Sequence, residues 1–334
     1  MDWALIGAST IASQNMIGAL RSQPGGVVRW VVSGSAEHVA DYAARHNIPH
    51  SGTDIAFALA DPEVDAVYIS STNEKHYGQA LAAIAAGKHV LCEKPLAMTT
   101  GEAASMVEAA EKAGVVFATN HHLRCSGSHQ AVRDLIRAGR VGTVLSVRVF
   151  HAVHLPESLQ GWRIHSADAG GGVVPDITVH DADVVRFILG EDPQSVVAQT
   201  ACSGMGQGVE DSAMSIWAMP SGAMVMSHES FTHPFAGSGL EVHGTEGSIF
   251  ARGVMTQRPV GEIELVTAQG RETVPFSDHN LYHFGVAQFC AAVAGTGAPA
   301  ASGLDGVKSL AVAQAVRDAA ATGTRVTVNY GALK

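Results

Sequence analysis

The first third of the chain alternates two patterns of hydrophobic and polar residues. Short runs that are apolar throughout predict strands at residues 3–8, 27–33, 66–70, 89–92 and 115–118. Between them, apolar residues recur every three or four positions and predict helices at 12–22, 36–46, 74–86 and 100–113. Strands that are apolar on both faces are typical of a parallel sheet with helices on both sides. The pattern therefore predicts a doubly wound α/β fold with right-handed connections.

After about residue 120 the pattern changes to strand-like runs that follow one another without helices between them. This succession favours a large open, mostly antiparallel sheet. Strands are expected at 143–150, 195–200, 213–219, 223–230, 239–243 and 263–267, and helices at 128–138, 176–189, 281–294 and 303–322. We therefore predict two domains, an α/β domain over 1–120 and an α+β domain over 121–334. The last helix is free to pack back on the first domain.

Composition and charge exclude several classes of function. The chain has 334 residues, of which 46% are hydrophobic, so it can form a substantial core. Its net charge of -10 argues against nucleic acid or an anionic membrane as the main partner. The four cysteines are far apart and predict reduced thiols in a cytoplasmic protein, with no zinc knuckle or redox dithiol. No secretory signal or membrane span is expected.

The turn after the first strand carries an altered dinucleotide-binding pattern. Three glycines are usual there: one for the tight bend, one for close approach of the pyrophosphate, and one for packing of helix on strand. Here Gly7 keeps the first place, while Ser9 and Ala12 occupy the other two. A serine hydroxyl can donate to a phosphate, alanine is still small, and the helix N-terminus attracts anions. An ordinary strand, turn and helix would look similar, and the turn alone does not decide between the two interpretations.

Ser33 stands at the end of the second predicted strand, where the nucleotide ribose is read. An acid at this place binds the 2′-hydroxyl of NAD and repels the 2′-phosphate of NADP. A hydroxyl tolerates the phosphate, so Ser33 favours NADP. The alternative is that Ser33 begins a turn and caps the next helix.

Glu93-Lys94-Pro95 follows directly on a buried strand. Ligands of doubly wound sheets bind at the carboxyl ends of the strands, so Lys94 is expected to face a ligand. A residue before proline is held extended, and the peptide bond can be cis. The alternative is an ordinary loop lysine.

A second cluster begins with three glycines at 170–172 and leads into Asp176 and His180. Residues four apart on a helix share one face, and a carboxylate beside an imidazole favours its protonated form, which suits a general acid. The alternatives are a capping Asp176 with an exposed histidine, or a pair of metal ligands; no further ligand set is evident, so no metal is predicted. Trp162 and Arg163 precede the glycines and could contact a ligand or serve packing.

These motifs together resemble the glucose–fructose oxidoreductase/inositol dehydrogenase family. The resemblance rests on the first turn, residues 72–76, Glu93-Lys94-Pro95 and Asp176…His180, in that order along the whole chain. It implies an N-terminal Rossmann domain and a C-terminal domain with an open sheet, as a monomer or as a homo-oligomer formed through that sheet. It also implies an oxidoreductase that uses NADPH, with NADH as a possible alternative, to reduce a small cyclic sugar ketone.

The same resemblance implies roles for individual residues. His180 would protonate the developing alkoxide, Asp176 would orient His180, and Lys94 would polarise or position the oxygen. The sequence does not decide whether Lys94 or His180 delivers the proton. Relatives with this turn carry an arginine where this chain has His38; an arginine is always charged and a histidine is not, so preference for NADPH is expected to be weaker. The implied cofactor residues are Ser9, Thr10, Ile11 and Ala12 at the pyrophosphate, Ser33 and His38 at the 2′-phosphate, Thr72, Asn73 and His76 at the ribose and nicotinamide, and Glu93, Lys94, Asn120, Trp162, Arg163 and Tyr282 at the nicotinamide end.

Two other functions fit parts of the sequence. One is an NAD-dependent polyol or sugar dehydrogenase of the inositol dehydrogenase kind, which Ser33 disfavours. The other is a sensor that binds a nucleotide or sugar without turnover. The presence of Lys94, Asp176 and His180 together favours catalysis over the sensor.

Overall fold

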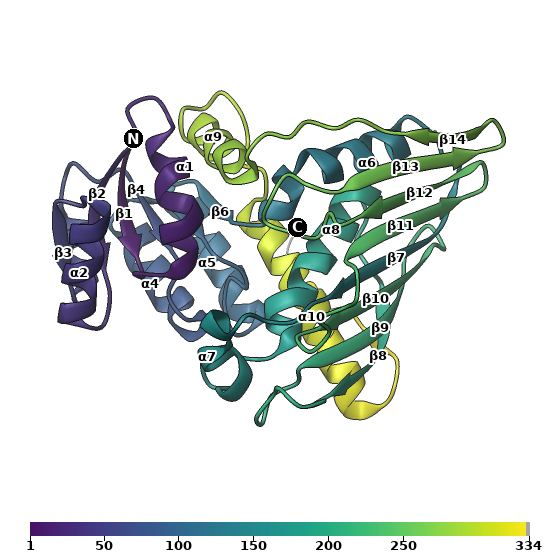
Figure 1. Ribbon diagram of the computed structural model, residues 1–334. Coiled ribbons are helices and arrows are strands. Elements are labelled where there is room, and N and C mark those ends of the chain that lie inside the picture. The colour runs from purple at the N-terminus through teal and green to yellow at the C-terminus, as the bar shows by residue number, and fades with distance from the viewer. Residues whose placement is uncertain (332–334) are drawn as a thin grey trace. The chain divides into compact units, whose positions relative to one another are not determined.

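The computed structural model describes residues 1–331, so the last three positions of the predicted second domain lie outside it. The chain forms two compact units (Figure 1). The first unit contains Met1–His121 and Tyr282–Val307, and the second contains His122–Leu281 and the residues from 308 onward. The returning segment of the first unit holds nearly all of α9 (Leu281–Val293) and the first turn of α10 (Gly303–Thr322).

The first unit is built on a six-stranded sheet in the order β3-β2-β1-β4-β5-β6. All neighbouring strands are parallel, which confirms the predicted doubly wound fold. The order reverses between β1 and β4, and ligands of such sheets bind beyond the carboxyl ends of the strands at that place. The strands are β1 (Asp2–Ile6), β2 (Val27–Val32), β3 (His50–Gly52), β4 (Ala66–Ile69), β5 (His89–Cys92) and β6 (Phe117–Thr119).

Three helices of the first unit, α2 (Ala36–His46), α3 (Ile55–Ala60) and α5 (Thr100–Ala113), begin after residues whose side chains cap them. In α5, Thr99 and Glu102 form a reciprocal capping box, and Gly114 ends the helix in a left-handed conformation. The helix predicted at 12–22 is instead a π-helical segment, η1 (Ala12–Met16), followed by α1 (Ile17–Arg21). The spacing of apolar residues is similar in π- and α-helical turns, so it could not predict the π-helical segment. Another helix, α4 (Asn73–Ala85), lies between β4 and β5.

The second unit contains a nine-stranded sheet in the order β14-β13-β12-β11-β7-β10-β9-β8-β15. Only β7 and β10 pair in parallel, so the predicted mostly antiparallel sheet is confirmed. The pattern missed β3, β14, β15 and α3, which are short, and also β12 and α7. The strands are β7 (Val144–Ala152), β8 (Ser195–Ala201), β9 (Ser212–Ala218), β10 (Met224–Ser230), β11 (Gly239–Gly244), β12 (Gly247–Arg252), β13 (Glu262–Thr267), β14 (Gly270–Thr273) and β15 (Val326–Thr327).

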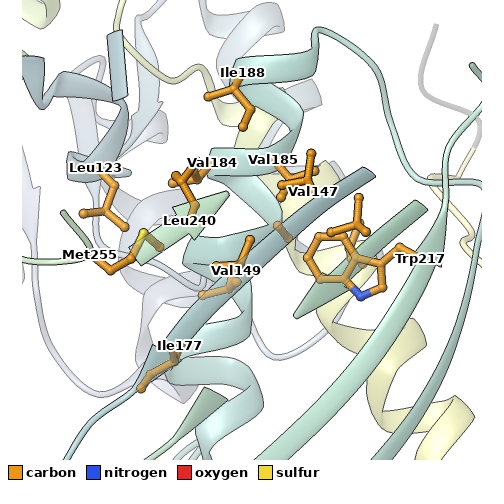
Figure 2. Close-up of a cluster of buried hydrophobic side chains, with 14 of the residues drawn as sticks. Leu123, Val147, Val149, Ile177, Val184, Val185, Ile188, Trp217, Leu240 and Met255 are labelled. Carbon is orange, nitrogen blue, oxygen red and sulfur yellow. The ribbon is translucent and has the colours of Figure 1, made fainter. Parts of the chain in front are cut away.

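One face of this sheet is covered and the other is open. Along β10, exposed Met224 and Met226 alternate with buried Val225 and Ser227. On the covered face, Val184 of α8 (Val179–Leu189) packs in one hydrophobic core with Val147 of β7 and other apolar side chains (Figure 2). The other helical segments of this unit are η2 (His122–Cys125), α6 (Gly127–Arg137), α7 (Glu157–His165) and η3 (Val174–Thr178).

Two further findings concern membranes and cysteines. Within residues 1–331, no helix is both long and apolar enough to cross a bilayer. Cys92, Cys125, Cys202 and Cys290 are all free thiols.

Candidate active site

The turn after β1 comes so close to the end of β4 that position 7 requires glycine. Gly7 has φ +117°, a left-handed conformation that other residues rarely adopt. A Cβ there would lie 2.7 Å from the carbonyl carbon of Ser70. This close approach is the physical reason for the tight bend that the sequence predicted at Gly7.

Ser9 replaces the second glycine and ties the turn together. Its Oγ lies 2.7 Å from Oγ of Ser70 and accepts a hydrogen bond from the N–H of Ala12 at 3.2 Å. The side chain of Ala12 is fully buried, as the packing role of the third glycine requires. The helical run begins at Thr10, and its first N–H groups have no acceptor within the helix. Thr10 and Ile11 therefore lie at a helix N-terminus that suits a pyrophosphate.

The end of β2 lies beside this turn and carries no carboxylate at position 33. Ser33 is half-buried, and its N–H donates to the carbonyl of Gly52. Ser35, not Ser33, caps α2, because its hydroxyl accepts from the N–H of His38. This finding removes the capping interpretation of Ser33. The exposed His38 ring reaches back, with Nε2 3.2 Å from the carbonyl oxygen of Ala8, so it lies next to the β1 turn.

Glu93 is buried at the end of β5 and is held by donors from the strands on both sides. The hydroxyl of Tyr68 on β4 and the amide of Asn120 after β6 both donate to Oε1 of Glu93, the latter at 2.6 Å. Burial raises the pKa of Glu93, while these two hydrogen bonds and the Lys94 ammonium act to lower it. The Lys94–Pro95 peptide bond is cis, as the sequence allowed. These contacts fix the backbone that carries Lys94.

His76 links the loops after β4 and β5. Its Nδ1 lies 2.8 Å from the carbonyl oxygen of Pro95, and its Nε2 lies 3.2 Å from that of Ser71. Burial lowers the pKa of this imidazole. Both ring nitrogens therefore lie against backbone carbonyls, so His76 supports the Lys94 loop, and its expected place at the cofactor stays a prediction.

Three other predicted cofactor residues also lie in the first unit. Thr72 precedes α4, and its hydroxyl donates to Glu74 at 2.7 Å. Asn73 is buried in the first turn of α4. Tyr282 is buried on α9, close enough to Tyr68 to help raise its pKa.

In the second unit, the glycines at 170–172 bring the end of α7 close to the start of η3. The N–H groups of Gly171 and Gly172 donate to the carbonyls of Ser166 and Arg163 at 2.8 and 2.9 Å. A Cβ at Gly171 would lie 2.7 Å from the carbonyl oxygen of Trp162. Glycine at these positions therefore keeps Trp162 and Arg163 next to Asp176.

Asp176 is paired with Arg163 in this arrangement. Nε of Arg163 lies 3.4 Å from Oδ1 of Asp176, and its guanidinium lies 4.7 Å from the Trp162 ring centre. Asp176 belongs to the π-helical η3, so the single helix predicted from 176 is corrected: α8 begins at Val179. π-helical turns are frequent at functional sites. The partner Arg163 was not foreseen for Asp176, because the two residues come from different helices.

His180 occupies the first turn of α8 and is buried. Its ring packs edge to face against His122, with ring centres 4.7 Å apart. His122 was not assigned to the site from sequence, although the His121-His122 pair was a visible signal. Within residues 1–331, no three His, Cys, Asp or Glu side chains are arranged to hold a metal ion.

The two units thus carry different groups of functional side chains. The first unit has the turn, the helix N-terminus and the strand ends that suit a nucleotide, with a lysine at one of those ends. The second unit has two imidazoles packed against each other, and an aromatic ring, a guanidinium and a carboxylate that contact one another. These side chains can bind a polar substrate and move a proton.

Comparisons with known proteins agree with this division. A family model described as an oxidoreductase family with an NAD-binding Rossmann fold matches residues 1–121, and a GFO/IDH/MocA C-terminal domain matches residues 129–250. The chain is 53% identical to 1,5-anhydro-D-fructose reductase of Ensifer adhaerens, over 98% of this chain and 99% of that protein. It is 29% identical to levoglucosan dehydrogenase of Pseudarthrobacter phenanthrenivorans, over 66% and 63% of the two chains. The chain also superposes on the crystal structure of aldose-aldose oxidoreductase from Caulobacter crescentus, with a TM-score of 0.89 over 98% of this chain and 99% of that one. The sequence identity is 24%, so this match shows a shared fold.

Proposed function

The chain belongs to the GFO/IDH/MocA oxidoreductase family, and we propose on this basis that it reduces 1,5-anhydro-D-fructose to 1,5-anhydro-D-mannitol with NADPH. The observation that carries the proposal is the 53% identity to 1,5-anhydro-D-fructose reductase over 98% of the chain. The altered glycine pattern, the lysine after β5 and the Asp176–His180 cluster are all compatible with this activity.

Residues of the first unit fit the cofactor. The close backbone at Gly7 and the helix N-terminus at Thr10 and Ile11 suit the pyrophosphate. Ser33 offers a hydroxyl where an acid would repel a 2′-phosphate, which supports NADPH. His38 lies beside the same turn, and its imidazole binds a phosphate more weakly than an arginine does. We therefore expect NADH to be used as well, at lower efficiency.

When bound, NADPH supplies the hydride that reduces the ketone carbon. We assign to His180 the donation of a proton to the oxygen that becomes the hydroxyl. The ion pair between Asp176 and Arg163 fixes both side chains. We assign to Asp176 the orientation of His180. The Lys94 ammonium positions the oxygen and stabilises its developing charge. A positioned proton donor of this kind contributes roughly 10²- to 10⁴-fold to the rate.

Product analysis tests the proposal. NMR of a reaction with 1,5-anhydro-D-fructose and NADPH is expected to show 1,5-anhydro-D-mannitol and no second epimer. If the ketone is unchanged, the assignment fails, and a screen of polyols with NAD then decides between a dehydrogenase and a sensor. Binding of NADPH without turnover of any substrate supports the sensor.

The compartment and partners follow from the same proposal. We place the enzyme in the cytoplasm, which its four free thiols support. Its partner is a small sugar ketone. The open face of the second sheet exposes Leu145, Met214, Ile216, Met224 and Met226, and we expect any homo-oligomer to form there.

A further inference from the structure

Beside the proposed acid lies a group of buried titratable side chains for which the proposed mechanism has no use. Asp181 directly follows His180 in α8, and its side chain is fully buried. Nδ1 of His151, on β7, lies 2.7 Å from Oδ1 of Asp181. The strand that carries His151 is thereby connected to the first turn of the helix that carries His180.

Glu229 completes the group from the next strand. Glu229 on β10 is the register partner of His151 on β7 and is fully buried. The hydroxyl of Ser227 donates to Oε1 of Glu229 at 2.5 Å. Two acids, one histidine and one hydroxyl from a helix and two adjacent strands therefore meet inside the second unit.

Asp181 and Glu229 lie in the same buried group, because His151 contacts the first and is the register partner of the second, and the charge of Asp181 acts on Glu229. Within residues 1–331, no N–H or hydroxyl donates to Oδ2 of Asp181 or to Oε2 of Glu229. A hydrogen bond between two carboxyl groups requires a proton on one of them, because two carboxylates have only acceptors. One proton shared between the two acids would satisfy both of these buried oxygens.

The surroundings decide which acid holds this proton. Burial raises the pKa of Glu229 well above its ordinary value, and the charge of Asp181 raises it further. Burial raises the pKa of Asp181 as well, but its partner His151 acts to lower it, and Asp181 lies in the first turn of α8, where the helix dipole favours a negative charge. These surroundings favour a proton on Glu229 and the charge on Asp181.

Other charged groups on the surrounding elements are turned away or already paired. On α8, Asp183 pairs with Arg124 at 2.6 Å, and in η3, which packs on β10, Asp176 pairs with Arg163. On β7, Arg148 pairs with Glu241, and β9 has no titratable side chain. His228 of β10 alternates with Glu229 and belongs to the opposite face of the strand. Arg186 of α8 pairs with Asp192. The groups that face Glu229 are therefore Asp181 and His151, and the buried His129 of α6 lies within electrostatic reach of His151.

We propose that Glu229 is a positioning residue: its protonated carboxyl, donating to Asp181, fixes the first turn of α8 and so holds His180 in place for proton transfer. The functional part of this inference rests on the proposed role of His180. The proton on Glu229 and its effect on the His180 ring do not, since both can be measured without substrate.

The proton is tested first, by infrared spectroscopy of the wild-type protein at neutral pH. A carbonyl band of a protonated carboxylic acid is expected, and it should be absent from Glu229→Gln. The matched control Glu93→Gln, a change at the buried glutamate of the first unit, should keep that band. The absence of any band that Glu229→Gln removes would overturn the proposal.

The positioning role is tested with two variants of similar size. Glu229→Gln still donates a hydrogen bond to Asp181 and should keep kcat and the imidazole NMR signals of His180. Glu229→Met cannot donate, so kcat should fall about ten- to a hundred-fold, the His180 signals should move, and NADPH affinity should stay unchanged. Because Glu229→Met can also lower stability, Asp211→Asn serves as control: it removes a buried carboxylate that binds the loop at 203–206 and should lower Tm without moving the His180 signals.

The outcomes separate the two proposals. If Glu229→Met leaves the His180 signals and kcat unchanged, or if Glu229→Gln behaves like Glu229→Met, the positioning role is overturned. If the wild type turns over no ketone while the infrared band and the NMR shifts appear as expected, the proposed function fails and the buried proton stands.

Discussion

Each unit buries a glutamate at or near the end of a strand, but the two side chains have opposite kinds of partner. Glu93, after β5, accepts hydrogen bonds from the hydroxyl of Tyr68 and the amide of Asn120. Glu229, near the end of β10, faces a second acid, Asp181. Burial raises the pKa of both glutamates. The partners then decide the result, because donors favour a carboxylate and a neighbouring carboxylate favours the protonated acid.

This difference matches the work that we assign to the two units. Glu93 acts as an acceptor that anchors the loop of Lys94 next to the cofactor turn. Glu229 acts as a donor that holds the helix of His180. The same residue type thus supports binding in one unit and proton transfer in the other. The predictions below separate these roles, starting with the largest expected effect.

Removal of the proposed acid should affect turnover and leave cofactor binding intact. His180→Ala is expected to lower kcat by roughly 10²- to 10⁴-fold, while the Kd of NADPH from fluorescence titration stays unchanged. His243→Ala, on β11 of the same unit, is the control and should behave like the wild type. A His180→Ala enzyme with near-normal kcat would contradict the division between the units.

The donors around Glu93 make its loss costly. Glu93→Met leaves the buried Tyr68 hydroxyl and Asn120 amide without this acceptor, at about 1–3 kcal/mol for each group. The free energy of unfolding should therefore fall by about 2–6 kcal/mol. Urea denaturation measures this quantity. Glu229→Gln provides the contrast and should change it by less than about 1 kcal/mol, because the glutamine amide replaces the protonated acid. If both variants lose the same free energy of unfolding, the proposed difference between the partners of Glu93 and Glu229 is wrong.

The proton on Glu229 also predicts how stability varies with pH. Above the ordinary pKa of 4.5 and below the raised value, the folded chain binds a proton that the unfolded chain has released. The stabilisation from this group is therefore fully present at acid pH and is lost as pH rises, by up to about 1.4 kcal/mol per pH unit. Urea titrations from mildly acidic to mildly alkaline pH should show this decline in the wild type and a smaller one in Glu229→Gln. Parallel curves for the two proteins would refute the proton assignment.

The smallest effect concerns cofactor choice in the first unit. His38→Arg places a permanent charge with several donors beside Ser33 and the β1 turn. NADPH should bind about five- to tenfold more tightly, while the Kd of NADH stays the same. Tightening of both cofactors to the same extent would mean that the side chain at 38 does not contact the 2′-phosphate.

The sequence predicted the elements whose signals are local. The ends of α2, α5 and α10 and of β5 agree with the predicted bounds, since amphipathic spacing and caps such as Ser35, Thr99 and Gly114 are visible in the chain itself. It also predicted the sheet types and the clusters around Gly7, Lys94 and His180. The roles of these side chains toward ligands stay predictions.

The sequence pattern did not predict contacts between residues that are far apart along the chain. The pairing of Arg163 with Asp176 depends on how the glycine run folds α7 back. The group of His151, Asp181 and Glu229 depends on strand register and on which face of α8 is buried. The contacts of the His76 ring nitrogens with two backbone carbonyls are also not visible in the spacing, and its expected place at the cofactor stays a prediction.

One measurement tests the central claim most directly: the loss of nicotinamide absorbance with 1,5-anhydro-D-fructose, followed in parallel with NADPH and NADH. The account predicts rapid loss with NADPH and a lower kcat/KM with NADH, because we assign the 2′-phosphate to Ser33 and His38, which lack the permanent charge of an arginine. No loss with either cofactor would contradict the assigned reaction.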